Sequence, residues 1–240
     1  MNLSIVIPAY NEQDRLGKTL GSIADAWGNA RMPGITLWEI VVADDGSQDR
    51  TSAIGAEWAG RLPMQSVRLE VNRGKGAAMR AGVAAATGEY VLMYDADGAT
   101  PITEVRKLFA ALEQEGSDIA IGSRVLERRA GLVTMQWHRR IIGRLYHGLC
   151  SLLVPGIHDT ACGCKLFKAP VAKKLFSLQR IDRFAFDVEV LALALRHRYK
   201  ISEVPLQWTA VPESKVNVVR DGLQMFWCVI SLYLRGGGSR

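Results

Sequence analysis

Two aspartates one residue apart follow an apolar run near the middle of the chain. The run Tyr90–Met93 leads through Tyr94 into Asp95-Ala96-Asp97. Such a run, closed by turn residues, predicts a buried strand with a loop beyond its carboxyl end. Because side chains alternate along extended backbone, the two carboxylates should lie close together on one side. Paired carboxylates predict a hard divalent cation, Mg²⁺ or Mn²⁺, that shares its other coordination positions with phosphate oxygens.

The segments around this loop alternate between strand and helix patterns. The predicted strands are 3–8, 37–43, 66–71, 90–94 and 118–122, and the predicted helices are 11–30, 48–58 with Ser47 as its cap, an alanine-rich segment ending near 86, and 103–115. This alternation predicts an α/β fold with a mainly parallel sheet covered by helices on both faces.

Four polar loops follow predicted strands, and in a parallel sheet such loops open on one edge, where ligands bind. They are Pro8-Ala-Tyr10-Asn-Glu12, Asp44-Asp45, the loop of Lys75, and Asp95-Ala96-Asp97. The sequence therefore predicts one shared site. A dinucleotide-binding turn is excluded because the first loop has no glycine, and the glycines around Lys75 lack the Walker spacing and its Ser/Thr.

Charge is distributed unevenly along the chain. Within a net charge of +6, residues 1–120 carry −5 and residues 121–240 carry +11. Residues 124–147 hold six arginines against the single acid Glu127. The guanidinium fork pairs bidentately with phosphate oxygens, so the first half suits a cation and the second half an anion. Nucleic-acid binding is disfavoured because the basic stretch lacks interleaved stacking aromatics.

Length and composition predict a single sizeable domain. The chain has 240 residues, of which 48% are hydrophobic. Its four cysteines lack the spacing of a disulfide framework or a zinc site, which favours reduced thiols in the cytoplasm. The first eight residues predict a strand and not a signal peptide. No run approaches the ~20 apolar residues needed to span a bilayer.

The motifs of these four loops, which together we call the rim, resemble those of the nucleotide-sugar-dependent glycosyltransferases of family 2, which have the GT-A fold. The matching runs are Val6-Ile-Pro-Ala-Tyr-Asn-Glu12, Asp44-Asp-Gly-Ser47, Asn72-Arg-Gly-Lys-Gly76 and Asp95-Ala-Asp97. The second half is similar to the dolichyl- and polyprenyl-phosphate glucosyltransferases and mannosyltransferases. Its matching runs are Gly122-Ser-Arg124, Asp159 to Phe167, Arg183 to Glu189, Glu203-Val-Pro205 with Trp208, and Glu213-Ser-Lys-Val216.

The resemblance implies a donor site and a metal site on the rim. It places a divalent cation, Mg²⁺ or Mn²⁺, on Asp95 and Asp97. Lys75 would lie near the diphosphate. The residues that would contact the nucleotide sugar are Pro8, Tyr10, Glu12, Asp44, Asp45, Lys75, Asp95, Ala96 and Asp97. A plain strand end at Pro8 and a plain turn at Asp45-Gly46 are the structural alternatives.

The resemblance also implies an anionic acceptor. Arg124, Arg139, Arg140 and Lys215 would bind a lipid phosphate, and Asp159 would lie near the sugar as an orienting group or base. A phosphate monoester, with a second pKa of about 6, is already a nucleophile near neutral pH. The catalytic set predicted in this way is Asp159, Arg124 and Arg139. N-capping is the structural alternative for Asp159.

The acceptor requires contact with a membrane. The segment 216–235 places Leu223, Phe226, Trp227 and Ile230 at helical spacing between basic residues. This pattern predicts a helix lying in the interface, with an ordinary packing or dimer helix as the alternative. We therefore expect a catalytic domain over 1–215, divided into a nucleotide-sugar half (1–122) and an acceptor half (123–215). The membrane helix and a flexible tail over 236–240 would follow.

The predicted enzyme transfers glucose from UDP-glucose to a polyprenyl phosphate with inversion. It would be peripheral on the cytoplasmic face of the membrane and free to form a homo-oligomer. The first alternative uses GDP-mannose. The second transfers sugar to a saccharide or protein hydroxyl, which would need a firm general base. The third, a non-catalytic nucleotide-sugar-binding protein, is disfavoured by the intact Asp95/Asp97 pair.

Overall fold

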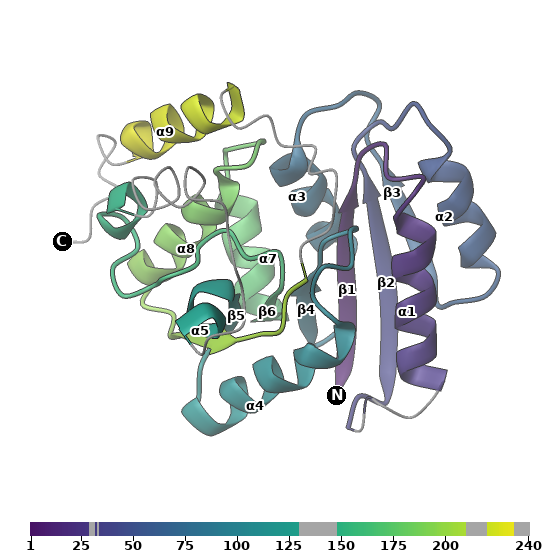
Figure 1. The fold of residues 1–240 in the computed structure, drawn as a ribbon, viewed down its shortest axis with the longest axis horizontal. Coiled ribbons are helices and arrows are strands. Elements are labelled where there is room, and N and C mark those ends of the chain that lie inside the picture. Colours follow the sequence, from purple (N-terminus) through teal and green to yellow (C-terminus); the bar gives the residue numbers. More distant parts are fainter. Residues whose placement is uncertain (29–31, 33, 130–147, 210–219, 233–240) are drawn as a thin grey trace.

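The computed structural model describes residues 1–28, 32, 34–129, 148–209 and 220–232. Within them a seven-stranded sheet is flanked by helices (Figure 1). The strands are β1 (Asn2–Ala9), β2 (Leu37–Asp44), β3 (Met64–Arg68), β4 (Tyr90–Met93), β5 (Ile119–Ser123), β6 (Lys165–Lys168) and β7 (Ile201–Pro205). The helices are α1 (Leu16–Gly28), α2 (Thr51–Ala59), α3 (Lys75–Ala85), the short 3₁₀ helix η1 (Ile102–Glu104), α4 (Val105–Glu115), α5 (Arg124–Arg129), α7 (Ala169–Leu178), α8 (Phe186–Arg196) and α9 (Arg220–Leu232).

The sheet is mainly parallel, as predicted, but one internal strand runs the other way. The order is β3-β2-β1-β4-β6-β5-β7, and β6 pairs antiparallel with both β4 and β5. The sequence pattern did not predict β6, because its four residues begin and end with lysine and lack an apolar run. Lys165 is nevertheless buried there, since a carboxylate from α8 neutralises it.

Alternating side chains in the strands form a core on each face of the sheet. Ile5 and Ile7 point toward one core, which also contains residues of α1 and α4. Val6 points toward the other, which contains residues of α3, α7 and α8. Because both faces are covered, β4 consists of apolar and aromatic residues alone and β1 is mostly apolar, as expected of a largely parallel sheet. Polar groups therefore gather at the edge of the sheet where the strands end.

Several element boundaries differ from the predicted ones. Helix α1 begins at Leu16 and not at Asn11, whose φ of 53° is left-handed. Helix α2 begins at Thr51, and Ser47 does not cap it, because its hydroxyl accepts the Asn11 N–H instead. Strand β3 is Met64–Arg68, shifted toward the N-terminus from the predicted 66–71. In the first two cases polar contacts between loops replace a turn of helix.

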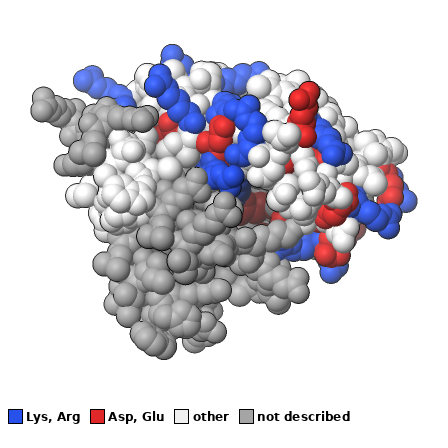
Figure 2. All heavy atoms as spheres, turned by 90° about the horizontal axis from the view of Figure 1, so that it is seen from above, with Lys and Arg blue, Asp and Glu red and all other residues white. Residues whose placement is uncertain are grey.

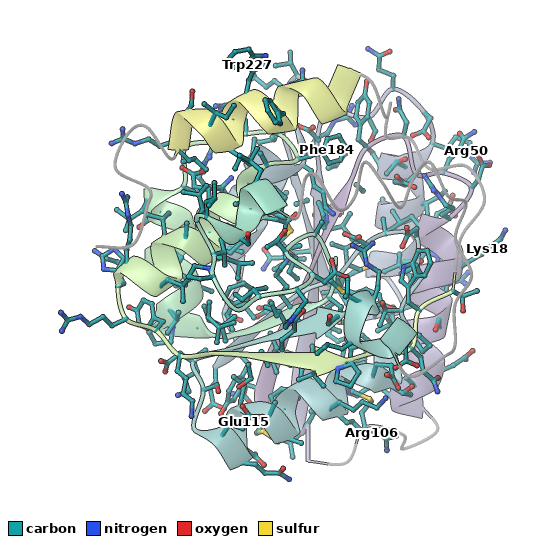
Figure 3. The ribbon with its side chains drawn as sticks, turned by 60° about the vertical axis from the view of Figure 1, so that its left-hand side comes forward. Lys18, Arg50, Arg106, Glu115, Phe184 and Trp227 are labelled. Carbon is teal, nitrogen blue, oxygen red and sulfur yellow. The ribbon has the colours of Figure 1, made fainter. Side chains whose placement is uncertain are left out.

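The C-terminal helix α9 packs on α8 (Figure 1). Two of its aromatic side chains are exposed. Val229 is fully buried in the second core, whereas Phe226 is 44% and Trp227 66% exposed. Figure 3 shows Trp227 pointing away from the rest of the molecule. Helix α9 is therefore a packing helix on one side, while its other side carries apolar groups at the surface. Among the described residues no helix has both the length and the hydrophobicity to cross a bilayer.

Candidate active site

The predicted rim is present at the carboxyl ends of three neighbouring strands. Strand β1 pairs with β2 so that Ala9 lies opposite Asp44, and with β4 so that Val6 lies opposite Met93. The loops after these strands thus emerge side by side at the upper edge in Figure 1. Figure 2 looks onto that edge and shows Lys and Arg side chains directly beside Asp and Glu side chains. Pro8 is buried within β1, whereas Tyr10 is 37% exposed at the rim.

The Asp95-Ala96-Asp97 loop is held by contacts on several sides. Thr19 of α1 donates its hydroxyl to the Ala96 carbonyl oxygen at 2.7 Å, and Ala96 is buried. The N–H of Ala99 donates to Asp97 Oδ1 at 3.0 Å, and the Ala99 carbonyl oxygen accepts the N–H of Thr209 at 2.9 Å. These bonds fix the backbone of the loop, so the direction of its two carboxylates is set by the fold.

Asp95 lies between a lysine and a glycine. Its Oδ1 is 2.6 Å from Lys75 Nζ. On another side the carboxylate fills the space of a missing side chain, because a Cβ on Gly163 would come within 1.8 Å of Asp95 Oδ2. Burial raises the pKa of Asp95, but Lys75, Lys165 and Arg124 lower it by more, so it stays below its ordinary value. Asp95 therefore feels cations from both halves of the chain.

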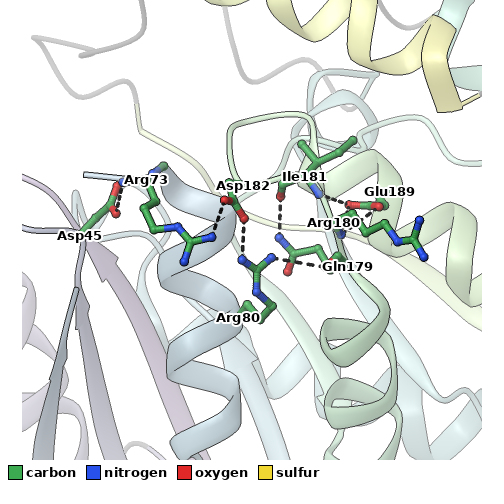
Figure 4. Close-up of polar contacts among 9 residues, drawn as sticks. Asp45, Arg73, Arg80, Gln179, Arg180, Ile181, Asp182 and Glu189 are labelled. Atoms are coloured by element: carbon green, nitrogen blue, oxygen red, sulfur yellow. Dashed lines mark hydrogen bonds and ion pairs between the residues drawn. The ribbon is translucent and has the colours of Figure 1, made fainter. Parts of the chain in front are cut away.

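The loop that carries Lys75 is anchored by Asp45. The Asp45 carboxylate accepts the N–H groups of Arg73 at 2.8 Å and Gly74 at 2.7 Å, and the side-chain amide of Asn72 at 2.8 Å. Figure 4 shows the Asp45–Arg73 contact beside the bond between Arg73 and Asp182. Asp45 thus has a structural role in placing Lys75 at the first residue of α3, and its contact with a nucleotide stays a prediction.

Glycine permits the close approach of this loop to the turn before α8. A Cβ on Gly74 would lie 2.5 Å from the carbonyl oxygen of Asp182, and one on Gly76 would lie 2.5 Å from that of Ile181. Arg80 Nη2 adds a 2.5 Å ion pair to the same Asp182. The glycines of Asn72-Arg-Gly-Lys-Gly76 therefore serve packing between the two halves of the chain, which sequence reasoning did not predict.

Two further residues predicted to contact the nucleotide sugar form hydrogen bonds within the protein. Asp44 is buried, and its carboxylate accepts the Ser47 N–H at 2.8 Å and the Ser52 hydroxyl. Glu12 receives a bidentate contact from Arg15, at 2.7 Å from Nε and 3.1 Å from Nη2. Both side chains stand on the rim as predicted. Their bonds orient them, and their contacts with ribose or base stay predictions.

Arg124 and Asp159 form one unit. Arg124 donates from Nε at 2.7 Å and Nη2 at 2.8 Å to the two oxygens of Asp159, and its backbone N–H donates at 3.0 Å. Burial raises the pKa of Asp159, but Arg124 lowers it by more, so it stays below its ordinary value. The guanidinium also lies 5.8 Å from the centre of the Trp208 ring. The structure therefore makes Asp159 the partner of Arg124, a role that sequence reasoning did not assign.

Glu203 on β7 holds the turn that carries Asp159. Its Oε1 accepts the Asp159 N–H at 2.8 Å, and its Oε2 accepts the His158 N–H at 2.9 Å. Oε2 is also 2.8 Å from His158 Nδ1. Glu203 belongs to one of the runs that carry the family resemblance, but the sequence indicated no role for it. No local signal would have found it, because its partners lie 44 and 45 residues earlier in the chain.

A buried ion pair lies beneath these groups. Lys165 Nζ contacts Asp187 of α8 and donates to the Cys162 carbonyl oxygen at 2.6 Å. Lys165 lowers the pKa of both Asp95 and Asp159, although burial raises them. Sequence reasoning assigned no role to Lys165. The structure joins β6 to α8 through this pair.

Three predicted phosphate ligands, Arg139, Arg140 and Lys215, lie outside the described residues. Within the described part of the chain, no three His, Cys, Asp or Glu side chains are grouped so as to hold a metal ion on their own. All four cysteines carry free thiols, and burial raises the pKa of Cys162 to about 11.

Comparison with known families decides what this arrangement belongs to. Residues 4–176 match the model described as glycosyl transferase family 2. The chain belongs to this family. The family assignment makes the protein a glycosyltransferase, and the matched stretch contains the rim, Arg124 and Asp159.

Similar proteins agree with this assignment. The chain is 37% identical to a dolichyl-phosphate beta-glucosyltransferase of Drosophila melanogaster, over 98% of this chain and 75% of that one. It is 36% identical to the Homo sapiens protein of the same name, over 97% of this chain and 75% of that one. A glucosyl-3-phosphoglycerate synthase from Mycobacterium tuberculosis, solved with Mn²⁺, UDP and glucosyl-3-phosphoglycerate, superposes with a TM-score of 0.67 at 22% identity, over 98% of this chain and 79% of that one. This structural likeness confirms the predicted GT-A fold.

Proposed function

We propose that this glycosyltransferase moves glucose from UDP-glucose to dolichyl phosphate or another polyprenyl phosphate, with inversion at the sugar. The observation that carries the proposal is the likeness, over almost the whole chain, to relatives named dolichyl-phosphate beta-glucosyltransferase. The geometry is consistent with it, because Arg124 of the basic half lies close enough to Asp95 of the rim to lower its pKa. Such a centre suits two anionic reactants, a nucleoside diphosphate and a lipid phosphate.

The rim residues fit a divalent cation whose coordination shell is completed by the donor. Asp97 is partly exposed beside Asp95, and carboxylate oxygens are the ligands that Mg²⁺ and Mn²⁺ prefer. A cation held by one or two carboxylates takes its remaining ligands from phosphates and water. Asp97 and Asp95 would hold the cation here, and when bound it would offset negative charge that develops on the departing diphosphate. The M. tuberculosis neighbour solved with Mn²⁺ and UDP is consistent with this assignment.

The remaining charged groups would neutralise and orient the reactants. Lys75 at the start of α3 binds a diphosphate oxygen as a point charge. Arg124 receives the acceptor phosphate, and its orientation comes from Asp159, whose two oxygens both contact the guanidinium. A carboxylate paired in this way is a weak base, so the attacking oxygen has to be an anion already. This favours a phosphate acceptor over a sugar or protein hydroxyl.

The test is a transfer assay with two donors. The purified protein is incubated with a short polyprenyl phosphate and radiolabelled UDP-glucose or GDP-mannose, with Mn²⁺ or with EDTA. Labelled lipid from UDP-glucose in the presence of Mn²⁺, and its loss in EDTA, is the expected result. Label from GDP-mannose alone would mean that the donor is GDP-mannose and not UDP-glucose. Label from neither donor would overturn the proposal.

We further propose that α9 brings the enzyme to the surface of its acceptor's membrane. Phe226 and Trp227 are exposed on this helix, and exposed Trp and Phe side chains on one side of a helix can bury into the membrane interface. Co-flotation with anionic vesicles should be lost in the F226A/W227A double variant. The matched control is Leu37→Ala. Leu37 is also an exposed apolar residue, but it lies at the start of β2 and so at the edge of the sheet opposite the rim. Equal flotation of the double variant and the wild type would contradict the proposal.

A further inference from the structure

The Lys75–Asp95 ion pair joins two groups that both have another partner in the proposed reaction. Lys75 Nζ is 2.6 Å from Asp95 Oδ1, and the exposed fractions of the two side chains are 22% and 33%. The proposed function gives Asp95 to a divalent cation and Lys75 to the donor diphosphate. In the absence of both ligands the two residues neutralise each other.

The surroundings leave Asp95 little freedom to avoid this competition. The backbone of Gly163 lies so close to the carboxylate that no side chain would fit between them. The preceding residue, Tyr94, is fixed by its backbone bond to Val6, and the following one, Ala96, by its bond to Thr19. Asp95 is therefore a fixed point, and a cation binding to Oδ1 meets the ammonium already there.

Lys75 has a fixed backbone and a movable side chain. Its loop is held by Asp45 and by the packing of Gly74 and Gly76 against the turn at 181–182. The four-carbon side chain ends in a compact charge that can turn about several bonds. Lys75 can therefore release Asp95 and contact a nearby phosphate oxygen without any movement of α3.

We infer that Lys75 is a built-in counter-ion that occupies the cation's place on Asp95 until the donor diphosphate draws it away. This inference rests on the proposed function for the identity of the donor. Without a nucleotide, the ammonium competes with the dication for one oxygen and repels it. A diphosphate gives the ammonium a new partner and adds ligands for the dication. Cation and donor therefore strengthen each other's binding, and each raises the affinity for the other by the same factor.

The inference makes an unusual prediction for Lys75→Met. Removal of the ammonium should lower the Kd for Mn²⁺ alone by about fivefold, as expected for loss of one partly exposed competing ion pair. The same change should raise the Kd for UDP in saturating Mn²⁺, because the diphosphate loses a cation. Titrations followed by Mn²⁺ electron paramagnetic resonance and by calorimetry measure both constants directly. Lys75→Gln, which keeps a hydrogen-bond donor but no charge, should change both constants in the same directions.

The matched control is Lys168→Met. Lys168 forms a 2.9 Å ion pair with Asp118, and its pairing with Tyr90, at the start of β4, places it at the opposite end of the strand from Asp95. This variant should bind Mn²⁺ and UDP like the wild type. Weaker or unchanged binding of Mn²⁺ alone in both folded Lys75 variants would overturn the inference, since a purely structural lysine would give that result.

The measurement separates the inference from the function on which it rests. Wild-type glucosyl transfer together with weaker Mn²⁺ binding in the Lys75 variants would overturn the counter-ion role and leave the function standing. Tighter Mn²⁺ binding in those variants, with no transfer by the wild type to any polyprenyl phosphate, would leave the counter-ion role and overturn the function.

Discussion

Gly163→Ala should disable the enzyme by displacing one carboxylate. A Cβ at this position would lie 1.8 Å from Asp95 Oδ2 and 2.1 Å from its Cγ. An ordinary carbon–oxygen contact is about 3.3 Å or longer, so the Asp95 carboxylate or the 162–164 turn must move by about 1.5 Å. Since both neighbours of Asp95 are fixed by hydrogen bonds, the movement falls on the carboxylate itself or on the turn beside it.

The size of the effect follows from this displacement. A misplacement of about 1 Å in a catalytic site can cost about 10²-fold in rate. We therefore expect kcat/KM for glucosyl transfer to fall by about a hundredfold. Forcing one extra methyl into a packed region typically costs about 1–3 kcal/mol in the free energy of unfolding, which leaves most of an ordinary domain folded.

The assay is steady-state glucosyl transfer, accompanied by urea unfolding of the same preparation. Gly28→Ala is the control, because a Cβ on this last residue of α1 would meet nothing within 4 Å. A Gly163→Ala protein that is folded and has wild-type kcat/KM would refute the reasoning. It would mean that the position of Asp95 against Gly163 is unimportant for the reaction.

Three further outcomes are expected. Asp97→Asn should lower kcat by more than a hundredfold, since loss of a cation ligand removes several kcal/mol of transition-state stabilisation, while the free energy of unfolding stays within about 1 kcal/mol of the wild type. Retained turnover would exclude the cation role. Glu203→Gln, which leaves the turn before Asp159 poorly held, should raise KM for the polyprenyl phosphate at least fivefold with little change in KM for UDP-glucose; equal effects on both would indicate general misfolding. The pKa of Asp159 is lowered in the folded protein, so its pairing with Arg124 stabilises the fold above the ordinary carboxyl pKa of about 4, and this stabilisation is lost as the pH falls through the lower folded-state value. In urea unfolding, the free energy of unfolding should therefore fall less between pH 7 and pH 3 for Asp159→Asn than for the wild type, and an equal fall would contradict the assignment.

The position of the rim loops could be predicted because the sequence signal for it is local. An apolar run followed by Asp95-Ala96-Asp97 indicates a strand and the loop at its carboxyl end. Once the strands are parallel, every such loop lies on the same edge, which brings Lys75 and Asp44 to the rim as well. The register of β1 with β2 and β4 confirms that reasoning.

The grouping of Arg124, Asp159 and Glu203 depended on contacts between distant segments. Arg124 follows β5, Asp159 lies in a turn 35 residues later, and Glu203 is on β7. These three become neighbours because β5 pairs with β7, a choice made by the packing of the whole sheet. An ion pair depends on the distance between its members, and no local pattern encodes that distance.

By itself, the sequence determined the fold class, the acidic rim and the separation of charge between the two halves, because periodicity, motif order and composition are properties of the chain. Only the tertiary structure decided how each charge is used. It turned Asp45 to its neighbouring loop, buried Lys165 against Asp187, and set Lys75 and Gly163 on two sides of Asp95. The physical reason is that a charged group binds the partner nearest in space, and the folded sheet alone determines which partner that is.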